Sequence, residues 1–415
     1  MHESTIYRRR EKLRKIADGS ELGGVYGAAI ARIKAQDGDK SRLGMAALLW
    51  ISHAERPLRA NELCHALAVE LGSTDFNIDN VPSVSTLVSC CQGLIAIDKE
   101  ASTVRLVHFT LQEYLSGHPD IFSRPHSAMA EICLTYLSSK QVKALSTYLS
   151  PDTRAMPFLE YCSVYWGVHA KRELSDCARL LALELLKGNY DQISTQFLLA
   201  RAEGFAHKEF DAFFPFSGLH CAAFFGIIEV VTTLIGMGCY DIDGGDFSGH
   251  TPLAWAAQNG HAGVVKTLLE WEEVNLDKPD NYGSTPLTHA ARFGHEGVVK
   301  ILLEREEVNP DKPGDAGRTP LSYAALSGHE GVVKILLGRE EVNPDKPDIS
   351  GWTPLSHAAW KGHEGVVKIL LAREEVNPDK PNNYGRTPLS LATAYGHERV
   401  VALLNSRQAA IPTTI

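Results

Sequence analysis

The stretch GSTPLTHAARFGHEGVVKILL, residues 283–303, encodes two short helices joined by a tight turn. The hydroxyl of Thr285 can cap the first helix by accepting a hydrogen bond from a backbone N–H of the first turn. Pro286 suits the first helical position, where no N–H donor is needed, and Gly294 can end the helix in a left-handed conformation. The apolar side chains of the VVKILL segment predict a second helix with one buried stripe.

The same pattern recurs along the second half of the chain with a constant period of 34 residues. One period before the first complete copy, the segment from Ser217 keeps the leucine and the alanine pair but lacks Thr-Pro. Six units are therefore predicted. Because neither helix of a unit can bury its stripe alone, we expect the units to stack into a solenoid with one continuous core. The threonines before Pro-Leu are Thr251, Thr285, Thr319, Thr353 and Thr387.

The repeated unit resembles the ankyrin repeat. Gly-x-Thr-Pro-Leu, Ala-Ala, Gly-His and Val-Val-x-x-Leu-Leu stand in this order in five units, which cover about half of the chain. The turn after the second helix departs from the usual Gly-Ala-Asp and reads Arg-Glu-Glu or an equivalent, which predicts a modified turn. The histidine that usually follows Thr-Pro-Leu is also missing, which removes the basis for its hydrogen bond with threonine. Its place is taken by Ala254, Thr288, Ser322, Ser356 and Ser390.

Positions just before Thr-Pro-Leu and just after Ala-Ala differ between otherwise nearly invariant units, and the resemblance places both on the concave face. Aromatic and basic residues dominate there, and such residues are over-represented at binding hot spots. Neutral variation of exposed positions is the alternative. We favour recognition of a protein partner, and Trp352 and Trp360 are the strongest candidates because exposed tryptophans are unfavourable without one. The predicted partner-binding residues are Phe247, His250, Tyr282, Arg292, Phe293, Arg318, Trp352, Trp360, Lys361, Tyr384, Arg386 and Tyr395.

The histidines of the Gly-His pairs form a regular series that raises the question of a metal site. Successive equivalent helices lie roughly 8–10 Å apart, whereas two imidazoles that share one zinc ion must each approach it to about 2.1 Å. We therefore expect no metal and a structural role in the loops. The histidines are His261, His295, His329, His363 and His397.

The first half of the chain is predicted to be helical apart from one hairpin. Within residues 41–122, three apolar stripes at helical spacing are followed by two short strands, Leu94–Ile97 and Thr103–Val107, and by a helix that begins near Thr110. That order predicts a winged-helix-like domain. Residues 1–40 are expected to form an N-terminal helical segment, 123–211 a helical connector and 212–415 the repeats, so the fold is mainly α.

Residues 50–58, 62–70 and 104–115 resemble the winged-helix region of fungal STAND proteins of the NACHT and ankyrin type, which are NLR-like signalling NTPases. In that family the residue at His108 senses the diphosphate of a bound nucleotide. The sequence contains no Gly-x-x-x-x-Gly-Lys-Ser/Thr loop, so this chain alone is not expected to bind nucleotide. Either it is a truncated paralogue or fragment of a longer NTPase, or His108 is a packed histidine, which we favour. Arg59 stands where the family commonly has a capping hydroxyl.

Several function classes are disfavoured. The net charge is -9 with a pI near 6.0, and residues 61–70, the second helix of the predicted winged helix, contain no Arg or Lys, so neither DNA nor anionic lipid is an expected partner. The eight cysteines are scattered without a CxxC pair, which indicates reduced core residues of a cytoplasmic or nuclear protein. No segment is long and apolar enough to span a membrane.

No HExxH, Gly-x-Ser-x-Gly or comparable catalytic pattern is present, so we expect no enzyme, no cofactor and no small-molecule substrate. The favoured hypothesis is a non-enzymatic interaction module that acts as a signalling or innate-immunity-like adaptor. The alternative is a sensor or switch fragment of a NACHT protein that needs an NTPase domain from another chain.

Overall fold

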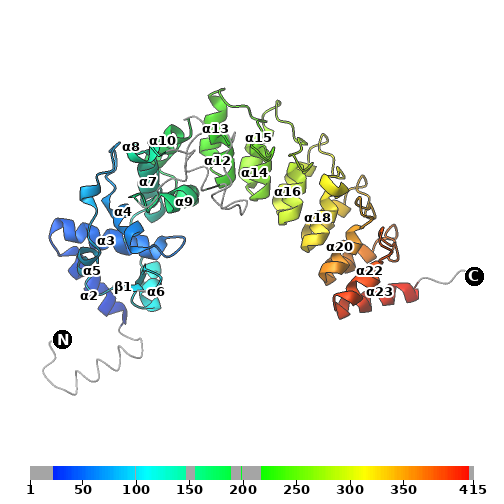
Figure 1. Cartoon of the computed structure of the whole chain (residues 1–415), viewed down its shortest axis with the longest axis horizontal. Helices are drawn as coiled ribbons and strands as arrows, with labels where there is room; N and C mark the ends of the chain where they lie inside the picture. Colours follow the sequence, from blue (N-terminus) through cyan, green and yellow to red (C-terminus); the bar gives the residue numbers. More distant parts are fainter. Residues whose placement is uncertain (1–21, 99, 146–154, 188–197, 199–215, 411–415) are drawn as a thin grey trace, which may run out of the picture. The chain divides into compact units, whose positions relative to one another are not determined.

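The computed structural model describes residues 22–98, 100–145, 155–187, 198 and 216–410 (Figure 1). The chain is mainly helical, as predicted. It divides into two compact units, one made of residues 1–185 and 191–212 and the other of residues 186–190 and 213–415. Of the predicted N-terminal helical segment, residues 1–21 lie outside the described residues, and the remainder holds helix α2 (Leu22–Lys34) and the start of α3 (Gly38–His53).

Within the first unit, the predicted winged-helix region has three helices, a hairpin and a fourth helix in the expected order. In the hairpin, Ile95 lies opposite Leu106 in an antiparallel pair. A further hydrogen bond from the Val107 N–H to the Leu94 carbonyl extends the pairing, so the predicted strands differ from the observed ones only at their ends. The elements are α3 (Gly38–His53), α4 (Ala60–Ala68), α5 (Val84–Cys90), β1 (Ile95–Asp98), β2 (Thr103–Leu106) and α6 (Phe109–Gly117).

Helix α4 begins without a capping hydroxyl, and a buried carboxylate takes over that role. Glu62 is only 2% exposed, and its side chain accepts a hydrogen bond from the Arg59 N–H at 2.7 Å. The guanidinium of Arg56 binds both oxygens of the same carboxylate at 2.7 and 2.8 Å. Because the buried charge is paired with Arg56 and also satisfies the first turn, the arginine at position 59 is compatible with a stable helix start.

The winged-helix region shares one aromatic core with the helices that follow it. Trp50 of α3 lies 5.3 Å from Phe158 and 5.8 Å from Tyr161, measured between ring centroids, and Tyr136 lies 5.4 Å from Phe158. All four side chains are buried. Burial of such large rings stabilises the unit, so α3, α7 (Pro125–Ser138) and α9 (Leu159–Arg172) are held together by one core. The following helices are α7 (Pro125–Ser138), α8 (Lys140–Lys143), α9 (Leu159–Arg172) and α10 (Asp176–Leu186).

The second unit is a stack of six helix pairs, which we number as repeats 1 to 6 from the N-terminal side. The first helices of neighbouring repeats pack against one another, and the second helices form a second layer (Figure 1). The first helices are α12 (Gly218–Phe225), α14 (Pro252–Gln258), α16 (Pro286–Phe293), α18 (Pro320–Ser327), α20 (Pro354–Lys361) and α22 (Pro388–Ala394). The second helices are α13 (Ile228–Gly236), α15 (Ala262–Leu269), α17 (Glu296–Leu303), α19 (Glu330–Leu337), α21 (Glu364–Leu371) and α23 (Glu398–Ala410).

A side-chain hydroxyl caps the first helix of every repeat. In repeats 2 to 6 the threonine hydroxyl accepts a hydrogen bond from the N–H three residues later at 3.1 to 3.3 Å. Repeat 1 uses Ser217, whose Oγ also lies 2.7 Å from Nδ1 of His220. The hydroxyl–histidine contact of the resembled family therefore survives only in the repeat that lost Thr-Pro.

The Gly-His histidines connect each repeat to the one before it. Nε2 of His363 donates to the Leu326 carbonyl at 3.0 Å, and each of the other four makes the equivalent bond at 2.8 to 3.0 Å. The same ring covers a glycine of the preceding repeat, since a Cβ added to Gly328 would lie 2.6 Å from Nδ1 of His363. These histidines are structural hydrogen-bond donors between repeats.

The acidic linkers also join neighbouring repeats. Lys346 donates to the carbonyl and the carboxylate of Asp311, both at 2.9 Å, and Lys380 makes the same two bonds to Asp345. Lys278 and Lys312 bond the equivalent carbonyls at 2.6 and 2.7 Å. Lysine–aspartate contacts therefore join successive linkers along the stack.

All eight cysteines are free, and six are buried, but the prediction that all are core residues is wrong for Cys177 and Cys239, which are exposed. Among the helices that the structure describes, none combines the length and apolar character needed to cross a bilayer.

Candidate functional site

The predicted partner-binding residues differ in their exposure. Four aromatic side chains are well exposed: Tyr282 at 56%, Phe293 at 46%, Tyr384 at 73% and Tyr395 at 54%. Three cations, Arg292, Lys361 and Arg386, are also exposed. Phe247, Arg318, Trp352 and Trp360 are half-buried, and His250 is buried.

His250 is an inter-repeat residue, and its prediction as an exposed contact residue is corrected. Its side chain is 9% exposed, with Nε2 3.4 Å from Oδ2 of Asp280 and Nδ1 3.6 Å from Oδ1 of Asp246. The same oxygen of Asp280 lies 2.9 Å from Nε2 of His289. The identity of residue 250 is therefore set by packing against an acid of the next repeat, and we exclude it from the partner-binding surface.

Aromatic rings and cations of repeats 3 and 4 contact one another. The guanidinium of Arg292 lies 5.6 Å from the ring centroid of Phe293 and 5.9 Å from that of Tyr323. Arg318 approaches the same tyrosine ring at 6.0 Å. These distances fall within the range of cation–π attraction. Sequence reasoning missed Tyr323, although Gly314, which replaces the aspartate of repeats 2, 3 and 5, was a signal that the residue at 323 has no acid to bond.

Repeats 5 and 6 continue the series. Trp352 and Trp360 meet edge to face at 5.5 Å, and Trp360 meets Tyr395 of repeat 6 at 6.1 Å. The ammonium of Lys361 lies 4.0 Å from the Trp360 ring centroid. Both tryptophans are half-buried because they pack on each other and on neighbouring rings, so the expectation of exposed tryptophans is only partly met.

Asp348 connects the contacts of repeats 3 and 4 with those of repeats 5 and 6. Arg318 Nε lies 3.4 Å from its Oδ2, His357 Nε2 lies 3.1 Å from the same oxygen, and the His357 ring stacks on Trp352 at 5.2 Å. A continuous set of rings and cations therefore runs across repeats 3 to 6. We call it the aromatic strip and define it as Arg292, Phe293, Arg318, Tyr323, Trp352, Trp360, Lys361 and Tyr395. Tyr282 and Tyr384 project from the loops before repeats 3 and 6.

Threonine caps, left-handed glycines and histidine bonds recur at one period, and the family comparison agrees with this geometry. The family model described as ankyrin repeats (three copies) matches residues 181–280, 219–313, 272–348 and 321–414, which together cover more than half of the chain. The chain belongs to the ankyrin-repeat family. Ankyrin-repeat architecture is generally non-enzymatic and serves protein–protein interaction.

The region before the ankyrin repeats matches a second family model, the winged helix domain of GPI inositol-deacylase, over residues 33–124. This match confirms the predicted winged helix and concerns that domain alone. No curated protein matches the chain.

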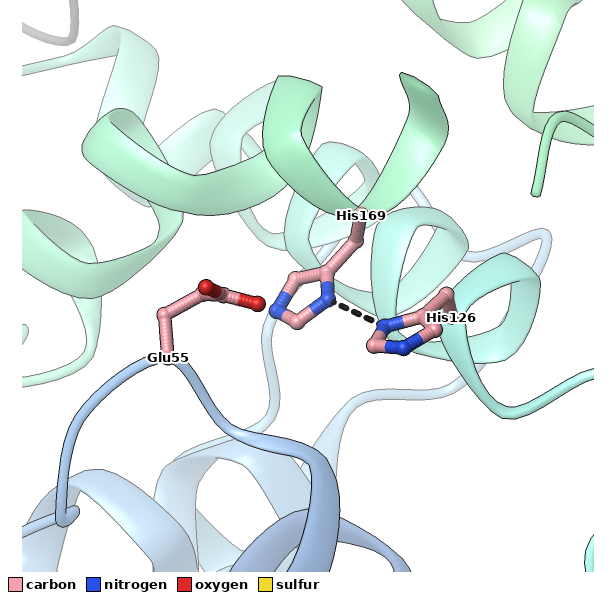
Figure 2. Close-up of side chains that lie close together, drawn as sticks. All are labelled: Glu55, His126 and His169. Carbon is pink, nitrogen blue, oxygen red and sulfur yellow. Dashed lines mark hydrogen bonds between the residues drawn. The ribbon is translucent and has the colours of Figure 1, made fainter. Parts of the chain in front are cut away.

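A cluster of metal-ligating side chains lies outside the ankyrin repeats. Glu55 follows α3, His126 lies on α7 and His169 lies on α9, and one possible ligand atom from each lies within 4.8 Å of the others. Figure 2 shows Glu55 and His126 on opposite sides of the His169 ring. The two Nδ1 atoms are 2.9 Å apart, and Nε2 of His169 is 2.9 Å from the hydroxyl of Tyr161.

This cluster fits a hydrogen-bonded network better than an ion. A tetrahedral zinc ion with bonds of about 2.1 Å would hold two nitrogens roughly 3.4 Å apart. Both ring nitrogens of His169 already have protein partners, and both oxygens of Glu55 are bound by Arg172. Burial, with smaller contributions from the neighbouring histidines and Arg172, lowers the pKa of His169 to about 3, so its ring is neutral.

The second such group, His250, Asp280 and His289, lies within the ankyrin repeats. The equivalent position one pair of repeats further on holds Arg318, Asp348 and His357, with an arginine where the first group has His250. Because arginine cannot bind a metal, the shared feature is donation to a buried aspartate, and we assign that role to both groups.

His108 is not the packed histidine that the sequence favoured. Its side chain is exposed, and it caps α6 by accepting a hydrogen bond from the Thr110 N–H at 3.3 Å. The same nitrogen lies 2.8 Å from the Thr110 hydroxyl, and the imidazole lies 4.6 Å from the Phe109 ring.

Proposed function

We propose that this protein is a non-enzymatic recognition module that binds a protein partner through the aromatic strip on the concave face of its ankyrin stack. The observation that carries this proposal is the continuity of the strip over four repeats. Its rings are partly exposed, whereas the hydrophobic core lies elsewhere, among residues such as Leu287, Leu321 and Leu355, which are 0% exposed. Tyrosine, tryptophan and arginine are the residue types that most often supply hot spots at interfaces.

Pre-organisation also supports a binding role. The contacts of Arg292 with two rings and of Lys361 with Trp360 hold both cations in place before a partner arrives. Side chains that are already ordered lose less conformational entropy on binding, so more of the contact free energy appears as affinity.

We further propose that the module works as a signalling adaptor of the fungal NACHT/STAND type in the cytoplasm or nucleus. The order of a winged helix, a helical connector and ankyrin repeats supports this, with proposed boundaries at 41–122, 123–211 and 212–415. In this proposal the ankyrin repeats recognise the protein partner, and the first unit transmits the signal or anchors the module.

Affinity capture with the full chain tests the recognition proposal. Wild-type protein and the variant Arg292→Ala/Phe293→Ala/Tyr395→Ala are immobilised on beads at equal density and incubated with native lysate. Bound proteins are then quantified by mass spectrometry. We expect partners retained by the wild type to be lost from the variant. The matched control is Lys300→Ala/Lys334→Ala, which removes exposed cations from the second-helix layer, and equal retention by all three proteins would contradict the proposal.

A second candidate function is a nucleotide-dependent switch whose NTPase domain comes from another chain. The observation that favours it is the exposure of His108 at the start of α6, since an exposed imidazole is available to a phosphate supplied from outside. Labelled ADP tests this candidate. The switch candidate predicts that ADP binds only when a NACHT-bearing chain is added and that His108→Ala abolishes this binding. Absence of ADP binding in every mixture excludes the candidate.

A further inference from the structure

Charge is distributed unequally between the two helix layers of the ankyrin stack. The first helices of repeats 2 to 6 contain no Asp or Glu. Acidic residues occur instead in the second helices, in the turns after them and in the loops before the first helices, as in Glu306, Asp315 and Asp348. Cations appear in the variable segments before Thr-Pro-Leu or after Ala-Ala of repeats 3 to 6, one in each repeat: Arg292, Arg318, Lys361 and Arg386.

Among the residues that the structure describes, three of these four cations have no acidic partner. Arg318 lies 3.4 Å from the buried carboxylate of Asp348, but within the described part of the chain no carboxylate lies within 4.0 Å of Arg292, Lys361 or Arg386. The first two cations instead lie over aromatic rings, which leaves N–H donors available. An unpaired guanidinium beside a ring can donate two parallel hydrogen bonds to a carboxylate.

Repeats 3 to 5 each therefore present one cation beside at least one aromatic ring and repeat 6 presents the exposed Arg386, whereas repeats 1 and 2 present no cation at these positions. Neighbouring helices are separated by roughly 8–10 Å. An extended peptide advances about 3.1 to 3.4 Å per residue, so about three of its residues span one repeat.

We propose that the partner binds as an extended acidic peptide, with carboxylates facing the cations and apolar side chains packing on the rings between them. This inference rests on the proposed function, because it assigns a chemical class to the ligand of the aromatic strip. Attraction between exposed charges is screened by salt, so binding weakens as ionic strength rises.

Fluorescence anisotropy with the full chain tests the proposal. The probes are three labelled peptides of about 12 residues, built from repeated Glu-Pro-Leu, Gln-Pro-Leu and Lys-Pro-Leu units, which share length and apolar content. We expect the acidic peptide to bind at least about tenfold more tightly than the neutral one, with that advantage shrinking as salt is added, and the basic peptide not to bind.

Two double variants locate the binding. Arg292→Gln/Lys361→Gln removes the acidic preference, whereas Lys300→Gln/Lys334→Gln, which changes the same net charge on α17 and α19, leaves it intact. Equal binding of acidic and neutral peptides, both lost in Trp360→Ala, would overturn the acidic inference and leave the recognition proposal standing. Failure of the acidic peptide to bind, or its loss only in the Lys300/Lys334 variant, also overturns the inference, and capture of native partners then tests the proposed function separately.

Discussion

Arg318 Nε lies 3.4 Å from Oδ2 of Asp348, and this pair joins the residue before Thr-Pro of repeat 4 to the first acid of repeat 5. His250 and Asp280 make the equivalent pair between repeats 2 and 3. Between repeats 3 and 4 the aspartate is replaced by Gly314, which lies against the backbone of Gly283 and Ser284. A basic residue in one repeat therefore occurs together with an aspartate in the next, which identifies the pair as a built contact between repeats.

Asp348 is predicted to stabilise the stack mainly through its loop. Its Oδ1 accepts hydrogen bonds from the N–H groups of Ser350 and Trp352, both at 2.9 Å. Asp348→Ala leaves those donors unpaired and should lower the free energy of unfolding by about 2 kcal/mol. Asp348→Asn should cost less than half as much, because Asn382 makes the same two bonds in repeat 6. Urea unfolding measures the free energy of unfolding of both variants. Equal losses in Asp348→Ala and Asp348→Asn would contradict a role that acts mainly through the loop hydrogen bonds.

Gly328 is predicted to be irreplaceable because of the next repeat. It has a φ of 82°, and a Cβ there would lie 2.6 Å from the His363 ring. Gly396 has a φ of 75° and no neighbour within 4 Å. Gly396→Ala should therefore cost only the left-handed backbone strain, about 1 to 2 kcal/mol, and Gly328→Ala distinctly more. Thermal unfolding of the two variants compares them directly, and similar melting temperatures would show that the histidine moves aside freely.

The buried His169 is predicted to make stability depend on acid pH. Its folded-state pKa, lowered by burial to about 3, is below the ordinary value of 6.5, so the unfolded state takes up the proton first as pH falls. The contribution of His169 to stability is present above pH 6.5 and is lost progressively toward pH 3, by up to about 1.4 kcal/mol per pH unit. Urea unfolding between pH 7 and pH 4 should show a shallower pH dependence in His169→Gln than in the wild type. Parallel curves would rule out this histidine as the source.

The tryptophans of the aromatic strip are predicted to matter more for binding than for folding. Trp352→Ala/Trp360→Ala removes half-buried rings and should cost about 1 to 2 kcal/mol of stability, while weakening partner capture at least about 30-fold, which corresponds to about 2 kcal/mol. Trp255→Ala is the contrast, because that ring is fully buried and donates to Asp246 at 2.8 Å. It should cost about 3 to 5 kcal/mol. Similar unfolding of the two variants would assign the strip tryptophans to the core.

Repeats 2 to 6 were predictable because each one carries its own signals at fixed offsets: a capping threonine, a proline and a glycine near the end of the first helix. The winged helix was predictable in the same way, from stripes and a polar turn that are local in sequence. Both predictions use interactions within a few residues of chain, and these depend little on tertiary context.

The sites were less predictable because they depend on contacts between distant residues. His250 is buried by an aspartate 30 residues further along, and His126 meets His169 across 43 residues. Tyr323 joins the strip because Gly314 replaces the aspartate of the preceding loop, a signal that appears only when the repeats are compared with one another. His108 was expected to be packed, yet its helix presents it at the surface.

Site-specific photo-crosslinking identifies which helix layer of the ankyrin stack contacts the partner. A photoreactive phenylalanine analogue is placed at Phe293 or Tyr395 in the aromatic strip, or at Lys300 or Lys334 in the second-helix layer, and the full chain is irradiated with its captured partner. Covalent adducts are expected from the two strip positions and none from the other two. Adducts from Lys300 and Lys334 without any from Phe293 and Tyr395 would contradict binding through the aromatic strip.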